Sequence, residues 1–433
     1  MHRNSWRMNV VANLRRLGAL SRTTPELDSL HLWLVHRPKY FLGIILSAPI
    51  VFCISALRPL VLLRFGVISS ERIGAFAPAA AYVSLIGSRV TKRLRTVDFV
   101  SITRPVSNLQ IELMLKRHVR IMPAPWLWLF FERACFFWTR SKMHQVGVRL
   151  KLQQLSQIYE NPEKLAFTSA EEQEGRNLVR ALGIPADSSW VCIHNRDSKF
   201  LASSLPAIKF APNSSWAFHS YRDFNVRCLS VAAEELADRG YYVLRMGAAV
   251  EEGFVSTDPR IIDYASTALR SDFADIYLLA NCAAYLGSDS GIFAIPLVFG
   301  KPTFLVNFPL AYCPQMTCTN SDPFIPKHLW HPETQHFLAL REVFELKLLF
   351  AGETRIYDEA GVELICNTPE EIRDLAVELD ERLKGIWSPD AEDERLQTRF
   401  WEIFRQYCPP DLVGGVQARI GSAFLRQNRY LLD

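Results

Sequence analysis

Residues 285–308 constrain the fold of this chain more than any other segment, and they read YLGSDSGIFAIPLVFGKPTFLVNF. An apolar strand ends at Leu286, a turn of small residues follows at 287–291, and an apolar helix and a second buried strand come next. A turn of this kind exposes backbone N–H groups and the positive end of a helix dipole, so a diphosphate would fit there. Small-residue turns also join strand to helix where no ligand binds. The turn therefore predicts a βαβ unit and, together with other groups, a phosphate site.

Strands and helices alternate on both sides of this unit. Apolar runs predict strands at 58–67, 190–194, 241–246 and 261–264, and periodic runs predict helices at 75–85, 225–239 and 272–282. The length of 433 residues favours two domains. We therefore predict an α/β fold with two doubly wound domains, residues 58–180 and 181–385, an N-terminal segment 1–57 and a helical extension 386–433.

The N-terminal segment differs in character from the rest. Basic residues dominate its first part, and residues 40–57 carry no charge but include Pro49. This run is at the short limit for crossing a bilayer, and the proline predicts a kink. Residues 125–138, PWLWLFFERACFFW, are rich in aromatic side chains that suit a membrane interface. An in-plane or re-entrant membrane anchor is our prediction, and a buried helix with ordinary core packing is the alternative.

Composition argues against several classes of function. The net charge of +4 is small and evenly spread, so we expect no nucleic-acid partner. The nine cysteines are scattered and form no Cys-x-x-Cys pair, which favours reduced thiols over a zinc site. Dinucleotide, Walker, zinc-protease and nucleophile-elbow motifs do not occur. We predict neither a metal nor a cofactor.

Polar side chains follow the predicted strands of the second domain. His194 and Arg196 come directly after a buried strand, and we predict both as catalytic residues. Arginine can form two hydrogen bonds to a phosphate, and histidine can donate one or titrate. Because ligands bind at the carboxyl ends of parallel strands, we expect phosphate-binding groups at the same edge. These are Arg222, Arg245, Ser288, Asp289, Ser290 and Gly291.

Two alternatives stay open for the arginines. In the first alternative, Arg196 forms a surface ion pair with Asp197, and that pair would contribute little to stability. Arg245 lies inside a predicted strand, where a charge needs a partner. In the second alternative it is a structural partner of Asp263 or Asp289.

The order of these motifs resembles a known family. VCIHNRDS, Ser220-Tyr221-Arg222-Asp223, RGYYVLRMG, the 285–309 segment and residues 320–327 (NSDPFIPK) are similar to the nucleotide-sugar half of GT-B glycosyltransferases, in particular a bacterial surface-polysaccharide family. Arg64-Phe65-Gly66 and Arg72-Ile73-Gly74 also fit that family, so the resemblance covers about 58–345. The GSDSG turn is more distantly similar to heptosyltransferases, and His194-x-Arg196 to fucosyltransferases.

The resemblance implies a metal-independent sugar transferase. Arg196 and Arg222 would neutralise the β-phosphate of a nucleoside-diphosphate sugar, and Ser288, Ser290 and Gly291 would hold the diphosphate. The acceptor would be a glycan or a lipid-linked molecule, and the protein would work at the cytoplasmic face of the inner membrane, as a peripheral or monotopic protein.

Departures from the family leave the reaction partly open. Ala75 stands where relatives carry a histidine, and the first domain lacks the aspartate that is the base in heptosyltransferases. The general base is therefore unassigned, and both inverting and retaining reactions are compatible with the sequence. A nucleotide-sugar epimerase or hydrolase and a non-catalytic glycan-binding scaffold are the alternative functions.

Overall fold

The computed structural model describes residues 38–87, 95–147, 155, 157, 158, 160, 165–204, 216–310, 322–349, 351–408 and 418–433. Contacts divide the chain into a smaller unit, residues 1–68, 86–103 and 119–149, and a larger unit, residues 69–85, 104–118 and 150–433. The predicted domains are contiguous, whereas these units alternate along the chain. The difference arises because residues 69–85 and 104–118 pack with the larger unit.

A seven-stranded sheet forms the centre of the described part of the larger unit, and all its pairs are parallel. Its strands are β12 (Arg419–Ile420), β8 (Pro323–Pro326), β7 (Thr303–Phe308), β6 (Ala284–Gly287), β3 (Trp190–His194), β4 (Tyr242–Arg245) and β5 (Ile261–Ile262), in this spatial order. Six of them follow the Rossmann order, because the chain runs outward from β3 to β5 and then restarts at β6 on the other side. The parallel α/β prediction for this region is confirmed.

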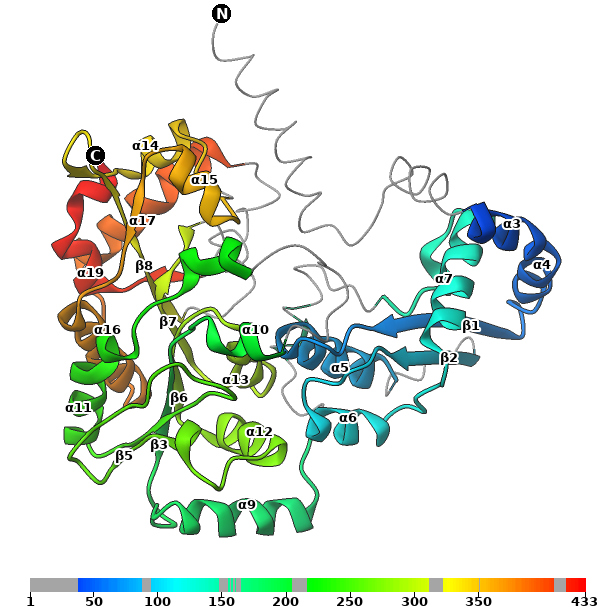
Figure 1. The fold of residues 1–433 in the computed structure, drawn as a ribbon, viewed down its shortest axis with the longest axis horizontal. Coiled ribbons are helices and arrows are strands. Elements are labelled where there is room, and N and C mark those ends of the chain that lie inside the picture. Colours follow the sequence, from blue (N-terminus) through cyan, green and yellow to red (C-terminus); the bar gives the residue numbers. More distant parts are fainter. Residues whose placement is uncertain are drawn as a thin grey trace, which may run out of the picture. The chain divides into compact units, whose positions relative to one another are not determined.

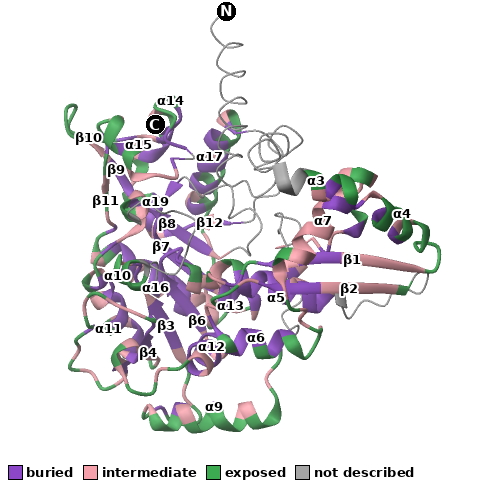
Figure 2. Ribbon diagram, turned by 45° about the vertical axis from the view of Figure 1, so that its right-hand side comes forward, coloured by how far each residue is buried: buried purple, intermediate pink, exposed green. Residues whose placement is uncertain are grey.

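Helices cover both faces of this sheet (Figure 1). On one face lie α11 (Ser230–Asp238) and α16 (Pro369–Leu383), and on the other lie α12 (Asp272–Asn281) and α13 (Ala294–Val298). The core between the layers consists of strand residues that are buried along their whole length, as in β6 and β7 (Figure 2). Strands buried on both faces need continuous apolar runs, which is why the sequence shows runs here and no alternation.

The remaining helices of the larger unit are short to medium in length. Their bounds are α5 (Ile73–Gly87), whose last two residues belong to the smaller unit, α6 (Leu109–Lys116), α9 (Ser169–Ala181), α10 (Lys199–Ser204), α14 (Leu340–Glu345), α15 (Thr354–Glu359), α17 (Ala391–Tyr407) and α19 (Ser422–Gln427). Helical 3-10 turns occur at η4 (Trp216–Arg222), η5 (Val226–Leu229), η6 (Tyr264–Ser266), η7 (Gly291–Phe293) and η9 (Arg429–Leu432). The apolar helix expected after the 287–291 turn is thus η7 followed by the short α13.

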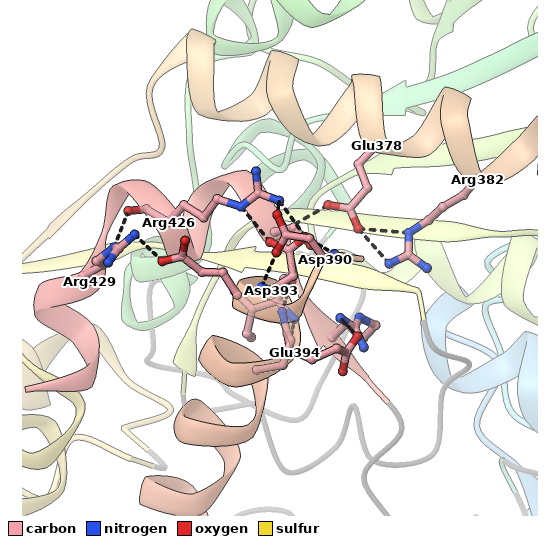
Figure 3. Close-up of polar contacts among 12 residues, drawn as sticks. Glu378, Arg382, Asp390, Asp393, Glu394, Arg426 and Arg429 are labelled. Atoms are coloured by element: carbon pink, nitrogen blue, oxygen red, sulfur yellow. Dashed lines mark hydrogen bonds and ion pairs between the residues drawn. The ribbon is translucent and has the colours of Figure 1, made fainter. Parts of the chain in front are cut away.

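Ion pairs and hydrogen bonds join the C-terminal helices of the larger unit to one another and to α16 (Figure 3). Asp390 caps α17, and Asp393 of the same helix accepts two hydrogen bonds from Arg426 of α19, at 2.6 and 2.7 Å. On α16, Glu378 accepts from Arg382 and from the backbone N–H of Ser422 at 2.9 Å. A small antiparallel sheet of β10 (His336–Phe337), β9 (His328–His331) and β11 (Glu363–Ile365) lies in the same unit.

The described part of the smaller unit is built on two parallel strands, β1 (Val61–Ile68) and β2 (Arg95–Ile102). Arg64 of β1 and Asp98 of β2 lie opposite each other and form two hydrogen bonds of 2.7 Å. Single bridges join Phe65 to Gln145 and Val100 to Ile121. The doubly wound first domain predicted for 58–180 is larger than this two-stranded sheet, since α5 and α6 pack with the other unit.

The described part of the smaller unit also contains three apolar helices and η1 (Lys142–His144). They are α3 (Pro38–Leu46), α4 (Ala48–Ala56) and α7 (Pro125–Thr139). Pro49 lies at the start of α4, where its missing N–H removes a helical hydrogen bond and favours the break after Ser47. Residues 1–37 lie outside the described residues. Across the described chain, every helix is too short or too polar to cross a bilayer.

Candidate functional site

The candidate site lies where the strand order of the seven-stranded sheet reverses, at the carboxyl ends of the neighbouring strands β3 and β6. His194 and Gly287 lie opposite each other in these strands, and the backbone N–H of Ser288 donates to the His194 carbonyl at 3.0 Å. Gly287 allows this close approach, because a Cβ atom at this position would lie 2.2 Å from the same carbonyl oxygen. Open parallel sheets bind ligands at such switch points.

Arg196 is buried beside β3 and pairs with a residue from another loop. Its guanidinium forms an ion pair with Asp223 and donates to the His219 carbonyl at 3.0 Å. Asp197, the surface partner in our alternative, accepts instead from the backbone N–H groups of Lys199 and Glu251. That alternative is therefore wrong, because the loop at 216–224 brings a better carboxylate to the guanidinium.

Arg222 connects the same loop to the turn after β6. Its guanidinium contacts the Asp289 carboxylate at 3.1 and 3.3 Å and also donates to the Asp289 backbone carbonyl. Arg196 and Arg222 act electrostatically on each other, and Asp289 acts on both. The structure thus brings the predicted β3 loop, the 220–223 motif and the 287–291 turn together.

Lys327 is a member of this cluster that our site prediction omitted. It follows β8, is almost fully buried, and its ammonium group donates to the Asp223 carbonyl at 2.7 Å. Burial lowers the pKa of Lys327, and the nearby Asp223 and Asp289 carboxylates act in the opposite direction. Its signal in the sequence was a single lysine directly after the apolar strand Pro-Phe-Ile-Pro.

The start of α5 adds a fourth cation. Arg72 directly precedes this helix and acts electrostatically on His219. The start of α5 also lies close to the turn after β6, because a Cβ atom built on Gly74 would lie 2.8 Å from the Cα atom of Gly291. The Arg72-Ile73-Gly74 motif therefore adjoins the turn after β6, within the larger unit.

Two buried hydroxyl groups lie at this edge. Ser288 and Ser290 are both more than nine-tenths buried, and both hydroxyl groups interact with the hydroxyl group of Tyr285, which also donates to the Ser288 carbonyl at 2.9 Å. Neither serine hydroxyl group makes a hydrogen bond of standard geometry within the described residues. Buried hydroxyl groups beside a cluster of cations can donate hydrogen bonds to an anion.

His194 is neutral at physiological pH. Its Nδ1 atom lies 2.9 Å from the Met246 carbonyl, which assigns the ring proton to Nδ1 and leaves Nε2 as an acceptor. Burial lowers the pKa of His194 to about 4, and the Arg245 and Arg196 guanidinium groups contribute to the decrease. A histidine in this state can accept a hydrogen bond from a ligand but is a weak base.

Arg245 is held by other groups of the protein. The side chain is fully buried, and its guanidinium contacts Asp263 at 3.1 Å, the Glu252 carbonyl at 3.0 Å and the Asn195 side chain at 3.2 Å. The second alternative, a pair with Asp263, is what the structure contains. A role of Arg245 in holding phosphate stays a prediction that these contacts do not favour.

Four basic and three acidic side chains meet in this cluster. Its described charged groups are Arg72, Arg196, Arg222 and Lys327 against Asp197, Asp223 and Asp289. We refer to these four basic residues as the cationic cluster. Such a site can hold an anion through charge-assisted hydrogen bonds. Within the described residues, no three His, Cys, Asp or Glu side chains converge in a way that could hold a metal ion.

Acid should weaken the folded protein through His219. Burial, with the guanidinium groups of Arg222, Arg196 and Arg72, lowers the pKa of His219 to about 3 from an ordinary value of 6.5. The unfolded chain therefore binds more protons between these values. The neutral His219 ring therefore contributes to the unfolding free energy in full above pH 6.5, and this contribution is lost as the pH falls toward 3.

The variant His219→Gln isolates this contribution. Between neutral pH and about pH 4 it should lose less unfolding free energy than the wild type, by on the order of 1 kcal/mol after allowance for partial solvent exposure. Urea titrations at several pH values measure the difference. Equal losses in the two proteins would show that His219 is not the group that titrates.

Comparisons with known proteins give structural neighbours only. Neither a protein-family model nor a curated protein matches the chain. The Escherichia coli ADP-heptose lipopolysaccharide heptosyltransferase II aligns over 56% of this chain and 84% of its own, with 15% identity and a TM-score of 0.26. The iron-containing dodecameric glycosyltransferase TibC from enterotoxigenic E. coli aligns over 59% of each chain, with 13% identity and a TM-score of 0.30. The chain is thus similar to heptosyltransferase structures at low TM-score and low identity.

Proposed function

We propose that this protein is a glycosyltransferase that binds a nucleoside-diphosphate sugar at the carboxyl edge of the seven-stranded sheet. The observation that carries the proposal is the convergence of the cationic cluster with the two buried hydroxyl groups of Ser288 and Ser290 at the switch point between β3 and β6. Charge, hydrogen-bond donors and position in the sheet all match a diphosphate. The sequence motifs shared with GT-B enzymes supply the reaction class.

The cationic cluster would act on the leaving group. When the bond between the sugar and the β-phosphate breaks, negative charge develops on the nucleoside diphosphate. Arg196, Arg222 and Lys327 are already held in place by Asp223 and Asp289, so they would stabilise this charge without reorganisation. This arrangement supports metal-independent transfer. His194, with its low pKa, would hydrogen-bond the donor through Nε2 rather than abstract a proton.

The acceptor is a glycan or a lipid-linked molecule in this proposal, as in bacterial surface-polysaccharide synthesis. The acceptor hydroxyl would attack the anomeric carbon, and its proton would go to a base that we do not assign. The reaction is tested by incubating the full chain with a panel of nucleotide sugars and candidate acceptors. Donor binding with sugar transfer is the expected result.

Other products would point to other functions. Isomerised sugar without an acceptor would indicate an epimerase, and free sugar as the sole product would indicate a hydrolase. Calorimetry that detects no nucleotide-sugar binding would overturn the proposal and leave a non-catalytic scaffold.

The two serines offer a sharper test of donor binding. Because their hydroxyl groups make no hydrogen bond of standard geometry and their nearest polar partner, Tyr285, keeps its bond to the Ser288 carbonyl, the double variant Ser288→Ala and Ser290→Ala should lose little stability. It should bind the donor about a hundredfold or more weakly, since each of the two hydrogen bonds to a charged group contributes about 1.5–3 kcal/mol. Calorimetry measures the dissociation constant.

Ser422 provides the matched control. It is also buried, and its hydroxyl group makes no hydrogen bond of standard geometry within the described residues, but it lies at the start of α19. Ser422→Ala should leave donor affinity unchanged. Equal affinities of the double variant and the wild type would contradict a diphosphate at the 287–291 turn.

A further inference from the structure

The smaller unit exposes an unusual number of large apolar side chains. Along α3, α4 and the turn that follows them, these exposed residues are Leu42, Ile45, Leu46, Ile50, Phe52, Leu57 and Leu60, which we call the apolar face. The outer sides of α3 and α4 are correspondingly marked as exposed in Figure 2. Single exposed apolar residues are normal in soluble proteins, but contiguous groups mark interaction surfaces.

Packing within the smaller unit accounts for the apolar residues on only one side of α3 and α4. Ile44 of α3 packs against Phe130 and Phe137 of α7, and Val51 and Ile54 of α4 pack into the cluster around Phe65 and Cys135. The opposite sides are also apolar, because residues 40–57 carry no charge. A helix that is apolar on all sides is normally surrounded by apolar material, and no described residue covers the apolar face.

Charge identifies the kind of partner. The described residues of the smaller unit include eight basic and only two acidic residues, a net charge of +6 against +4 for the entire chain. Arg58 lies two residues after the end of α4, Arg140 caps α7 and Lys142 lies two residues further on, and all three are exposed. Basic side chains beside an inserted apolar surface are the pattern that binds anionic lipid.

Aromatic residues and helix length fit the same partner. Trp126 and Trp138 lie near the two ends of α7 and are exposed, and indole rings favour the boundary between lipid headgroups and acyl chains. Each of α3 and α4 has nine residues, or about 13.5 Å, so the pair reaches into one leaflet of a hydrocarbon core about 30 Å thick.

We propose that the apolar face inserts into one leaflet of an anionic phospholipid membrane, with Arg58, Arg140 and Lys142 at the headgroups. This inference is independent of the proposed function, because lipid binding requires neither donor nor transfer. It assigns a membrane-docking surface to α3, α4 and the turn after them.

Vesicle flotation with the full chain tests the surface. The wild type should float with vesicles of equal parts phosphatidylethanolamine and phosphatidylglycerol, and more weakly with phosphatidylcholine alone. The double variant Leu46→Glu and Phe52→Glu places charges at side chains that are 67% and 74% exposed, so the fold should be preserved. Its vesicle affinity should fall about tenfold or more, as apolar contact is lost.

Exposed apolar residues of the larger unit supply the matched control. Ile386 is 68% and Val255 is 91% exposed, and the double variant Ile386→Glu and Val255→Glu should float like the wild type. Arg58→Glu with Lys142→Glu should weaken binding to the anionic vesicles, by roughly fivefold per charge removed, and should have less effect on phosphatidylcholine.

Three outcomes would overturn the proposal. The first is that the wild type fails to float with anionic vesicles. The second is that the double variant Leu46→Glu and Phe52→Glu floats as well as the wild type. In the third outcome this variant changes the oligomeric state on gel filtration while flotation persists, which would assign the apolar face to a second copy of the chain.

Discussion

Replacing Arg196 with alanine is expected to reduce sugar transfer by roughly 10²–10³-fold, the usual effect of removing one preorganised group that stabilises transition-state charge. Arg196 is held by Asp223 and by the His219 carbonyl, so its guanidinium is already fixed before a ligand arrives. Alanine would remove this charge and would also leave the Asp223 carboxylate unbalanced in a mostly buried position. Steady-state kinetics and donor calorimetry, with thermal unfolding in parallel, measure the two effects.

Two further variants separate function from folding. Arg196→Lys keeps the charge but loses the planar fork, and it should recover stability more than it recovers transfer. Arg227→Ala removes an exposed arginine that pairs with Glu252 and should change neither property. A folded Arg196→Ala protein with wild-type donor affinity and rate would refute the role of this residue in the site.

The substitution Gly287→Ala is expected to cost about 3 kcal/mol or more of unfolding free energy, a large value for one added methyl group. The new Cβ atom would lie 2.2 Å from the carbonyl oxygen and 2.9 Å from the nitrogen of His194. Both are backbone atoms of the neighbouring strand, so a side-chain rotation cannot relieve the contact. β3 and β6 would have to separate at the edge where the site is built.

Urea unfolding compares this variant with a glycine that has room. At Gly253 the nearest atom to a new Cβ is an Asp263 carboxylate oxygen at 3.5 Å, an ordinary contact distance. Gly253→Ala should therefore unfold close to the wild-type midpoint, whereas Gly287→Ala should unfold at much lower urea. Similar midpoints for the two variants would mean that the strands are not as close as described.

The sequence predicted the layout of the site better than its contacts. Apolar runs identified β3, β4, β6 and β7, and the rule that parallel strands end at one edge brought Arg196, Arg222 and Ser288 together. The sequence did not predict which carboxylate pairs with each arginine, because that depends on how the loops fold in three dimensions. Asp223 lies 27 residues from Arg196 and replaces the adjacent Asp197 as its partner.

Other features depended on tertiary packing alone. Arg245 looked like a ligand-binding residue, yet Asp263, Asn195 and the Glu252 carbonyl surround its guanidinium. Lys327 closes the 320–327 motif, but it was omitted from the site because the sequence does not show that this lysine reaches Asp223. The assignment of residues 69–85 and 104–118 to the larger unit was also out of reach, since helix periodicity shows that a helix has an apolar side but not which partner covers it.

The alternation of the two units bears on how the protein is made. Within the described residues the chain passes between the units at 68–69, 85–86, 103–104 and 118–119. Residues 69–85, with a largely buried α5, therefore leave the ribosome more than two hundred residues before Gly291, the glycine that touches Gly74. Their apolar side must wait for its partner during translation, and such exposed intermediates are where chaperones act.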